Sequence, residues 1–391
     1  MARARHARRV KPSVPVVAPA PLGESLALLA LARTPGVGPL RAADLLRSFG
    51  SASETVEAGR RGAWQDLPRW PRQRARAAGR AVDLAAAERE LRRGQRVGAR
   101  LVTLADAAYP QPWRPADGWP LVLWVRGAWP AAVTGHAPRA VAIVGPRRAS
   151  PDARRFASEL ALAACRAGTW VVSGLAYGVD AAAHQGAIDA ARAGSAASTL
   201  AVLAGGVDRV HPVAHRDLAR ALLDAGGGIV AAAPVGTGPA TGAFPVRNRW
   251  IAGLSSLVAV VEAGPRSGAL HTATAALELG REVRTTPARP WDAHAGGSLA
   301  LLRDGAAPLL EPDDAWLGLP AGIRPDPPAV RAAGPGAPPA PWDRILGASA
   351  IDVDTAIAAT GWGVGAVVAA LEGGVVDGWA TRLPDGRYRR T

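Results

Sequence analysis

The stretch "AVAIVGPRRASPDARRFASELALAACRAGTWVVSG", residues 140–174, decides the fold of this chain. It begins with an apolar strand at 140–145 and ends with a second at 169–174, and neither strand alternates polar with apolar residues. Between them lies an amphipathic helical pattern, with Ser150 as its candidate cap and Pro151 at its first position. Strands that are apolar on both faces are typical of a parallel sheet covered by helices on both sides.

The alternation of apolar strands with amphipathic helices continues to about residue 311. Further strands are predicted at 199–206, 228–234, 256–264 and 282–288, with helices at 179–194, 214–227 and 268–280, and a final helix and strand before 311. We therefore predict an α/β fold, a Rossmann-like doubly wound parallel sheet, over residues 138–315.

Outside this sheet the chain is predicted to have five parts. They are a disordered basic tail (1–22), a helical hairpin domain (23–100), a connector (101–137), a proline-rich linker (316–342) and a winged-helix domain (343–391). Within the second part, "TPGVGP" (34–39) lies between two helical patterns, and such a glycine turn exposes N–H groups that can hold a phosphate. This segment resembles the helix-hairpin-helix (SAM-like) element of DNA-binding proteins, although an ordinary helical hairpin has the same pattern.

The formal charge of the chain is +14, from 46 basic and 32 acidic residues. Residues 1–135 carry 22 basic and 10 acidic residues, whereas residues 316–391 carry seven of each. A basic balance of this kind favours a polyanionic partner, most often nucleic acid, although a solvated tail would also show it. Arginine replaces lysine almost everywhere, as G+C-rich coding would produce, so we weigh where arginines lie and not how many there are.

The single cysteine, Cys165, lies in a helical pattern, where a small buried thiol is the expected role. One cysteine excludes a disulfide within the chain, which fits a reducing compartment. No apolar run approaches the roughly 20 residues of a membrane-spanning helix, and the basic start is followed by prolines instead of a secretory apolar core. We expect a cytoplasmic protein without a membrane segment.

Four loops at the predicted carboxyl ends of strands carry polar and basic groups. They are "VGPRRAS" (144–150), "SGLAYGVDAAAH" (173–184), "FPVRNRW" (244–250) and "EAGPRSGALHT" (262–272). Doubly wound sheets bind ligands at this edge, where glycines let a ligand approach the backbone and arginines supply charge. The sequence has no G-x-G-x-x-G after its first strand and no G-x-x-x-x-G-K-[ST], so the dinucleotide and P-loop signatures are absent. We predict a phosphate site suited to an extended phosphodiester backbone.

Catalytic patterns are weak. Asp180 and His184 lie four residues apart and would share a helix face, as an acid–base pair requires. A helix cap and a hydrogen-bonded histidine are the more ordinary roles for such residues. The histidines lack metal-ligand spacing with carboxylates or the cysteine, and no Ser–His–Asp order is evident. We therefore predict that the chain is not an enzyme and uses no cofactor and no metal.

The motif "FPVRNRW" holds Asn248, the only asparagine of the chain, between Arg247 and Arg249. An asparagine near a helix start can cap the helix, but Ser, Thr or Asp would serve there as well. We interpret Asn248 as the residue that fixes the turn so that both arginines face the backbone of a nucleic acid.

In chain order these loops resemble the DNA-processing protein A family (DprA, also called Smf). The resemblance rests on "VAIVGPRRAS", "SGLAYGVDAAAH", "TLAVLAGGVDRVHP", "FPVRNRWIAGLS", "VVEAGPRSGALHTATAALELGREV" and "LLRDGA", and it extends over nearly the whole chain. It implies a dimeric protein that binds single-stranded DNA and helps load the RecA recombinase onto it in natural transformation.

The family motifs also imply where the DNA binds. Arg147 would be the main contact of the first loop, Arg247 and Arg249 would line the same pocket, and N–H groups around Gly174 would assist. The predicted DNA-binding set is Gly145, Arg147, Arg148, Ser173, Gly174, Arg247, Asn248, Arg249, Ser267 and Gly268. Three aromatic side chains are candidates for base stacking: Tyr177, Phe244 and Trp250. With so few aromatic residues, electrostatic contacts should carry most of the affinity.

Two other classes of function are alternatives. Related Rossmann-like hydrolases cleave the N-glycosidic bond of nucleoside monophosphates, but their "PGGxGTxxE" signature is absent from this sequence. A winged-helix transcription factor is the second alternative. The zero net charge of residues 316–391 argues against DNA reading by that part and favours protein contact.

Overall fold

The computed structural model describes residues 22–391 apart from 69, 293, 317–341, 347–348 and 377–378. The chain divides into two compact units, Met1–Pro325 and Asp326–Thr391. The predicted basic tail and proline-rich linker lie, except for their end residues, outside the described residues.

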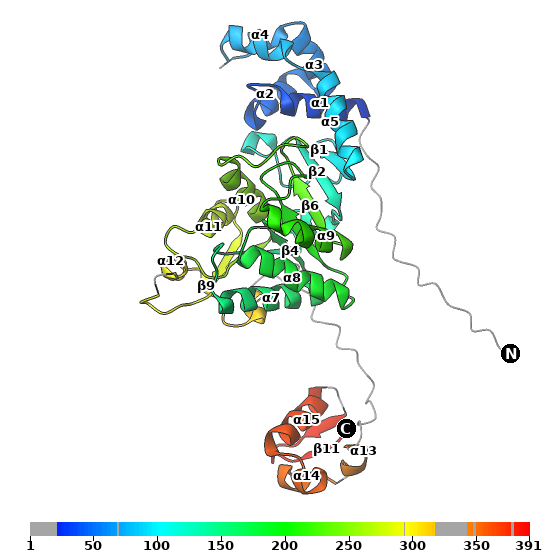
Figure 1. The fold of residues 1–391 in the computed structure, drawn as a ribbon, viewed down its shortest axis with the longest axis vertical. Helices are drawn as coiled ribbons and strands as arrows, with labels where there is room; N and C mark the ends of the chain where they lie inside the picture. Colours follow the sequence, from blue (N-terminus) through cyan, green and yellow to red (C-terminus); the bar gives the residue numbers. More distant parts are fainter. Residues whose placement is uncertain (1–21, 69, 293, 317–341, 347–348, 377–378) are drawn as a thin grey trace, which may run out of the picture. The chain divides into compact units, whose positions relative to one another are not determined.

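A nine-stranded sheet forms the centre of the first unit (Figure 1). Its strands are β1 (Ala99–Thr103), β2 (Val122–Gly127), β3 (Ala140–Val144), β4 (Trp170–Ser173), β5 (Thr199–Val202), β6 (Gly228–Ala231), β7 (Leu257–Val260), β8 (Glu282–Thr285) and β9 (Ala307–Pro308). They are ordered β1-β2-β6-β5-β4-β3-β7-β8-β9, and each neighbouring pair from β6 through β3 to β9 is parallel. The predicted α/β fold with a mostly parallel sheet is confirmed.

Two strands come from residues that we assigned to the helical part and the connector. β1 pairs antiparallel with β2, Thr103 opposite Val122, and β2 pairs antiparallel with β6, Gly127 opposite Gly228. The first four residues of β2 are buried. The segment before the predicted sheet therefore extends the same sheet beyond β6.

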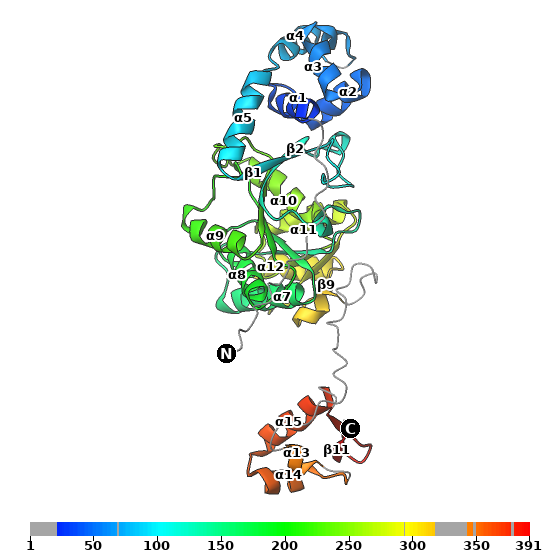
Figure 2. The same ribbon diagram turned by 90° about the vertical axis from the view of Figure 1, so that its right-hand side faces the viewer.

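Strand order fixes the side of the sheet on which each helix lies. β3 and β7 are neighbours near the middle of the sheet. From β3 the chain adds strands outward to β6 on one side, and from β7 it adds strands outward to β9 on the other. Because parallel crossovers are right-handed, one face is covered by α7 (Pro151–Arg166), α8 (Val179–Arg192) and α9 (Arg216–Asp224), and the other by α11 (Ala269–Glu278) and α12 (Gly296–Arg303). Figure 2 shows α8 and α9 on one side of the sheet and α11 on the other. The sheet therefore has a topological switch point between β3 and β7.

The start of α7 is the one that its sequence predicts. Ser150 Oγ accepts the N–H of Ala153 at 3.1 Å, and Pro151 is the first residue of the helix. α7 packs so closely on α8 that a Cβ on Gly186 would lie 2.1 Å from the carbonyl oxygen of Ser158. The two helices therefore require a glycine at their contact.

The core follows the composition only in part. Every residue of β3 is buried, and the surrounding cluster consists mostly of Ala, Val and Leu, as we predicted. Yet Trp64, Trp113 and Trp124 are fully buried, and all three lie before the predicted sheet region. Tryptophan therefore supplies much of the core volume in the helical part and the connector.

The segment 244–250 is helical, so our prediction of a loop there was wrong. It lies in α10 (Ala243–Gly253), between β6 and β7. Pro245 is the third residue of this helix. A proline is tolerated at that point because the N–H groups of the first turn have no partner within a helix. Asn248 lies in the middle of α10 and does not cap it.

Among the described residues, five α-helices precede the sheet: α1 (Leu22–Arg33), α2 (Pro39–Phe49), α3 (Ala52–Arg60), α4 (Arg72–Arg80) and α5 (Leu84–Arg96). The turn at 34–38 joins α1 to α2, and Gly36 adopts a φ of 82° there, which glycine adopts without strain. The predicted helices on both sides of this turn are thus found. Short helical segments elsewhere are α6 (Ala131–Thr134) and 3₁₀ turns at Ala63–Asp66, Pro115–Asp117, Val213–His215 and Pro312–Ala315.

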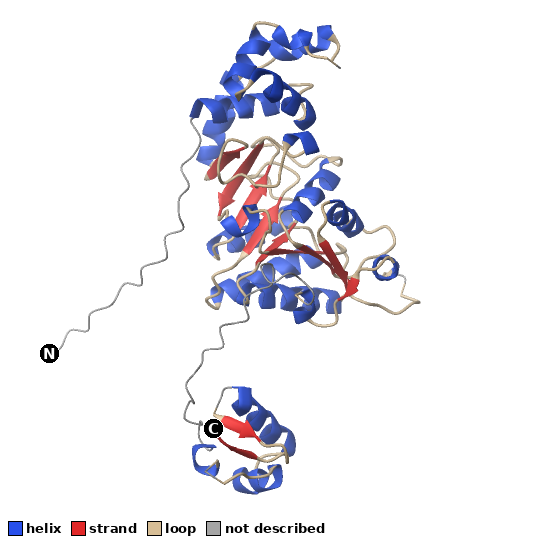
Figure 3. Ribbon diagram, turned by 180° about the vertical axis from the view of Figure 1, so that it is seen from behind, coloured by secondary structure: helices blue, strands red, loops and turns tan. Residues whose placement is uncertain are grey.

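The second unit contains α13 (Trp342–Ile345), α14 (Val353–Thr360) and α15 (Val364–Val376), followed by a hairpin of β10 (Ala380–Arg382) and β11 (Tyr388–Arg390) (Figure 3). We predicted a winged-helix domain for residues 343–391, and that assignment stays a prediction. Trp342, Trp379 and Tyr388 belong to its small core. No single described helix has both the length and the hydropathy needed to cross a membrane. Taken together, α14 and residues 364–375 have sufficient length and hydropathy, but the two segments are bent by 110° relative to each other.

Candidate functional site

A cleft of about 760 Å³ lies at the switch point of the sheet. Its walls are the loop after β3 (144–148), the first half of α10 and the segment from the end of β7 into α11 (262–272). This is the place where doubly wound sheets bind ligands, and the volume is within the roughly 300–1,000 Å³ of ordinary ligand pockets.

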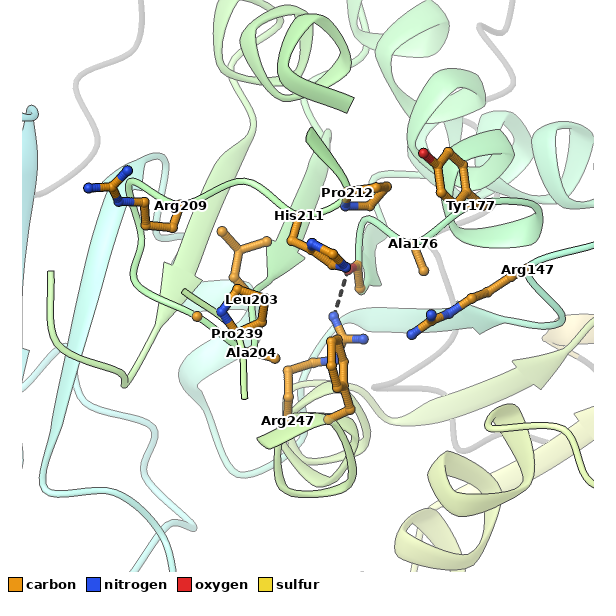
Figure 4. Close-up of a pocket in the computed structure, with 13 residues that line it drawn as sticks. Arg147, Ala176, Tyr177, Leu203, Ala204, Arg209, His211, Pro212, Pro239 and Arg247 are labelled. Atoms are coloured by element: carbon orange, nitrogen blue, oxygen red, sulfur yellow. Dashed lines mark hydrogen bonds between the residues drawn. The ribbon is translucent and has the colours of Figure 1, made fainter. Parts of the chain in front are cut away.

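A much smaller cavity of about 30 Å³ adjoins the cleft. Figure 4 shows Arg147, His211 and Arg247 around it, and both arginines also line the cleft. A water molecule needs roughly 10–15 Å³ of such space, so this cavity holds only about two or three. The large cleft is therefore the candidate site.

Three exposed arginines border the cleft. Arg147 and Arg148 follow β3, and Arg266 follows β7. Among the residues that the structure describes, none of the three guanidinium groups has a hydrogen bond or ion pair. Arg147 lies over the ring of Phe244, with its guanidinium carbon 5.4 Å from the ring centre. These cations are free to bind an anion in the cleft.

Arg247 is placed differently. It is only 6% exposed, and its Nη1 donates to the carbonyl oxygens of Gly174 (2.6 Å) and Val202 (2.7 Å). The carboxylate of Asp180 accepts the N–H groups of Gly174 (3.0 Å) and Ala176 (3.3 Å). A cation and an anion thus hold the two ends of the same residue, and they fix the loop after β4.

This arrangement revises two of our expectations. The N–H of Gly174 is already donated to Asp180, so it has no hydrogen left for a phosphate. Ser173 is fully buried, and its hydroxyl donates to the carbonyl oxygen of Ile143. Both residues support the loop from behind, because β4 ends inside the sheet and only the following residues reach the cleft.

Burial also shifts the titration of the two charged groups. It raises the pKa of Asp180, against the opposing effects of Arg247 and of the N–H groups of Ala176 and Gly174. Burial lowers the pKa of Arg247. The negative charge of Asp180 opposes this shift, whereas the positive charge of Arg147 adds to it. Burying either charged group alone costs free energy, so the two groups are stable only in the arrangement that fixes the loop after β4.

Asn248 contacts two walls of the cleft. Its Oδ1 accepts the Nε–H of Arg247 at 3.2 Å, and its Nδ2 donates to the carbonyl oxygen of Gly268 at 3.2 Å. The amide therefore ties α10 to the start of α11 and orients Arg247. It contacts one of the two arginines that we expected it to position.

Arg249 points away from the cleft. Its Nη1 donates to the carbonyl oxygen of Asp117 at 2.7 Å, and its guanidinium carbon lies 4.5 Å from the ring centre of Trp119. We expected it to line the same pocket as Arg247. Residues two apart on an α-helix point in nearly opposite directions, so the helical form of this segment separates the two side chains.

The start of α11 faces the cleft. Ser267 Oγ accepts the N–H of Ala269 at 3.3 Å, and Gly268 precedes the first residue of the helix. No acidic residue lies in the first turn of α11, so its N–H groups present positive potential to the cleft. Across the cleft, a Cβ on Gly145 would lie 2.3 Å from the carbonyl oxygen of Val261, so this glycine lets the first arginine loop approach β7.

The sequence reading missed Glu262. It follows β7 with a φ of 58°, a conformation that is rare for residues other than glycine. Its carboxylate accepts the N–H of Ser150 at 3.2 Å and the Ser150 hydroxyl. Glu262 thereby anchors the arginine loop after β3 to the end of β7. A carboxylate placed directly after a buried strand was the available signal.

The three aromatic candidates also separate. Phe244 lines the cleft, and Tyr177, which is 46% exposed, lines the small cavity beside it. Trp250 is partly buried against the main core. Only the first two are placed where a base can stack.

His184 and Asp180 bind different partners. The Nδ1 of His184 lies 2.7 Å from Thr199 Oγ1, deep between α8 and the sheet, and His184 does not line the cleft. Burial, and then the charges of His215 and Arg247, lower the pKa of His184 to about 3. Over the part of the chain that the structure describes, no group of three His, Cys, Asp or Glu residues could hold a metal ion.

The low pKa of His184 predicts a pH-dependent stability. An unfolded histidine titrates near pH 6.5, so the unfolded state binds a proton that the folded state excludes. This contribution is complete above about pH 6.5, and it falls by about 1.4 kcal/mol per pH unit as the pH drops toward 3. Urea denaturation at several pH values should show a shallower loss for His184→Gln than for wild type. Equal slopes would contradict the burial of a neutral imidazole.

The chain is similar to proteins of one known family. Residues 100–319 match the family model described as "DNA recombination-mediator protein A". A DprA of Mycobacterium tuberculosis is 39% identical over 246 residues, which are 60% of this chain and 61% of that protein. Protein Smf of Escherichia coli is 33% identical over 296 residues, 74% of this chain and 77% of its own length. The chain therefore spans less than two thirds of the Mycobacterium tuberculosis relative.

A solved structure shows the same fold. The X-ray structure of DNA processing protein A from Streptococcus pneumoniae superposes with a TM-score of 0.60 at 24% identity, over 75% of this chain and 96% of that one. The matched family region contains the whole parallel sheet and every residue that lines the cleft. Because the family model covers more than half of the sequence and Smf matches about three quarters of it, this chain belongs to the DNA recombination-mediator protein A family.

Proposed function

We propose that this protein binds single-stranded DNA in the cleft between β3 and β7. The observation that carries the proposal is the set of three exposed arginines, Arg147, Arg148 and Arg266, which border one cleft and form no hydrogen bond or ion pair within the described residues. The two carboxylates of the cleft, Asp180 and Glu262, already accept hydrogen bonds. Four arginines, Arg247 among them, line the cleft against these two carboxylates, so the cleft offers an excess of positive charge to phosphates.

The size of the cleft supports a single strand. At about 760 Å³ it is as large as a small-molecule site, so it accepts one or two nucleotides of a flexible strand and not a stacked duplex. Phe244, beneath Arg147, offers a surface on which any base can stack. Phosphate contacts and stacking do not read sequence, so binding should be sequence-independent.

The family supports a role in recombination. We propose that the protein is a mediator that loads RecA onto incoming single strands in natural transformation, as a cytoplasmic homodimer without a membrane segment. We further propose that the 34–39 turn is a helix-hairpin-helix element and that residues 343–391 form a winged helix, as their element order supports. Catalysis is not part of this proposal, because both cleft carboxylates are held by backbone or hydroxyl groups.

We expect Arg147→Ala to weaken the binding of single-stranded oligonucleotides. The loss should be about equal for oligo-dT and for strands of other sequence. The loss of one phosphate contact should reduce the slope of log K against log salt by about 0.7. Fluorescence anisotropy at several salt concentrations measures both effects. Arg155→Ala is the matched control, because Arg155 is exposed on α7, pairs with Asp152 and lies outside the cleft.

The proposal fails if Arg147→Ala binds oligo-dT as tightly as wild type, or if Arg147→Ala weakens binding of a blunt duplex as much as binding of oligo-dT. A second measurement concerns the mediator role. The rate of RecA assembly on oligo-dT should rise in the presence of wild type and not in the presence of Arg147→Ala. If neither protein raised the rate of RecA assembly, the proposed RecA loading would be wrong, whereas the proposed DNA binding would stand.

A further inference from the structure

The N-terminal helices carry a second concentration of arginines, far from the cleft. We define the α4 surface as Arg41, Arg72, Arg74, Arg76 and Arg80, which are all exposed. In Figures 1 and 2, α1 and α2 lie between α4 and the sheet. We propose that the α4 surface binds the phosphodiester backbone of double-stranded DNA. This proposal goes beyond the single-strand site and does not depend on it.

The arginines face solvent because the other side of α4 is made of small residues. Ala75, Ala78 and Gly79 are buried. A Cβ on Gly79 would lie 2.6 Å from the carbonyl oxygen of Gly59, so α4 packs tightly on the end of α3. The helix is therefore fixed on its apolar side, and its basic side is left open.

The charge of α4 is not compensated locally. On the neighbouring helices, three exposed arginines pair with carboxylates one turn away: Arg47–Asp44 (3.1 Å), Arg60–Glu57 (3.5 Å) and Arg92–Glu88 (3.5 Å). α4 contains no acidic residue, and within the described residues the ion pairs of its arginines are limited to Arg72 with Asp66 at 3.8 Å.

This lack of pairing has a cost. Arg72, Arg76 and Arg80 follow one another at intervals of four residues, so they form a row of like charges along one side of the helix. Such a row destabilises an isolated helix. A row of like charges that destabilises a helix and is not paired with carboxylates is typical of a binding surface.

Two hollows flank the helix, and each is lined by arginines. One, of about 400 Å³, contains Arg41, Arg74 and the edge of Trp70. The other, of about 450 Å³, contains Arg72, Arg76 and Arg80. Ala77 lines both hollows, so its small side chain separates them without blocking either. A polyanion can therefore lie across α4 and contact arginines on both sides.

Arg41 is held in position before any ligand binds. Its Nη1 donates to the carbonyl oxygen of Gly36 at 2.8 Å, and its guanidinium carbon lies 5.0 Å from the ring centre of Trp70. A guanidinium fixed in this way loses little freedom when it binds a phosphate. Arg41 lines the first hollow together with Arg74.

The spacing fits a nucleic-acid backbone. With a rise of about 1.5 Å per residue, Arg72, Arg76 and Arg80 span about 12 Å along the helix axis. One strand of a duplex carries a phosphate about every 3.4 Å along its axis, so this row faces three or four phosphates.

The α4 surface lacks the features that other partners require. Trp70 is 8% exposed and lies under Arg41, so no aromatic ring is available for unstacked bases. The apolar side of α4 is buried against α3, so it cannot insert into a membrane. A protein partner would need apolar or aromatic anchors at its centre, and the exposed residues of α4 are Arg, Gln and one Ala. A duplex backbone needs none of these.

The test uses the full chain with Arg72, Arg76 and Arg80 each changed to Gln. The probe is a blunt DNA duplex followed by anisotropy at several salt concentrations. We expect the triple variant to lose at least about tenfold in duplex affinity at low salt and about 2.7 in the slope of log K against log salt, which corresponds to three phosphate contacts. Short oligo-dT, bound in the cleft, should be retained within about twofold.

A matched control removes the same charge from paired arginines of the same helical part. Arg47→Gln, Arg60→Gln and Arg92→Gln in one chain should change duplex affinity by less than about threefold. Replacing the three α4 arginines by Lys should retain most of the duplex binding, because the charge is kept. The thermal unfolding temperature of the α4 Gln variant should be no lower than that of wild type, because the substitutions remove a row of mutually repelling charges.

Equal losses in the two Gln triples would show a general charge effect and overturn the proposal, as would wild-type duplex binding by the α4 variant. Phosphatidylserine vesicles and poly-glutamate are tested with the same proteins. Loss of binding to either one, with duplex binding unchanged, would assign the surface to a membrane or to an acidic protein instead. Arg147→Ala separates the two sites, because it should weaken oligo-dT and leave the duplex unaffected.

Discussion

Arg247→Ala is expected to lower the free energy of unfolding by about 3–5 kcal/mol, the usual cost of removing one member of a buried charged group. Arg247 is 6% exposed and holds the carbonyl oxygens of Gly174 and Val202. Its loss leaves both oxygens without their donor and the buried Asp180 without the nearby cation that opposes its burial. The substitution also opens a cavity beneath Phe244, whose ring lies 5.9 Å from the Arg247 guanidinium carbon.

Urea denaturation of the variant and wild type at neutral pH measures this effect. The matched controls are Arg147→Ala and Arg249→Ala, which remove the same charge from an exposed and a half-exposed position. Arg147→Ala should change stability by less than about 0.5 kcal/mol, as exposed substitutions usually do. Arg247→Ala and Arg147→Ala should therefore both reduce DNA binding, but only the first should reduce stability. Unchanged stability in Arg247→Ala would mean that its hydrogen bonds do not hold the loop after β4.

Much of the sheet could be predicted because parallel strands are locally readable. Strands β3 to β7 are short and mostly apolar, and α7, which connects β3 to β4, begins with a clear signal in Ser150 and Pro151. The order of strands and helices then requires the switch point, and the switch point requires the cleft. Arg147 and Arg148 could be located from sequence because they follow directly after a strand.

The positions of Arg247 and Arg249 could not be read in the same way. A proline, two arginines and an asparagine within seven residues favour a loop, and the segment becomes a helix because it packs between the core and α11. Once it is helical, the two arginines must diverge, one into the interior and one onto Trp119. Strand β1 was missed for a similar reason, since its pairing with β2 depends on residues about twenty positions away.

Glu90 shows how the helical part is attached to the sheet. It lies on α5, is 8% exposed and accepts Nε and Nη2 of Arg33 at 2.8 and 2.9 Å. It also accepts Nε1 of Trp124 on β2 at 2.8 Å and the N–H of Val235 after β6 at 3.3 Å. A single carboxylate therefore joins α1, α5, β2 and the loop that leads to α10, which explains why the first unit includes both the helices and the sheet.

Glu90→Ala should therefore lower the free energy of unfolding by about 3 kcal/mol, because Arg33 and the Trp124 and Val235 N–H groups all lose a charged acceptor. Burial alone would raise the pKa of Glu90, but Arg33, Trp124 and Val235 together hold it below the ordinary value. The stabilisation is thus present above about pH 4.3, where an unfolded glutamate ionises, and is lost as the pH falls through the lower folded pKa.

The same helix provides the control for this prediction. Glu88 pairs with Arg92 at 3.5 Å, but both side chains are at least half exposed. Glu88→Ala should therefore cost less than about 1 kcal/mol and leave the acid dependence of unfolding unchanged. Because Glu90 also accepts the N–H of Val235, in the loop that leads to α10, its substitution should weaken oligo-dT binding in the cleft, whereas Glu88→Ala should not. Equal destabilisation by the two substitutions would mean that the attachment of the helices rests on apolar packing alone, since charge burial is what distinguishes these two carboxylates.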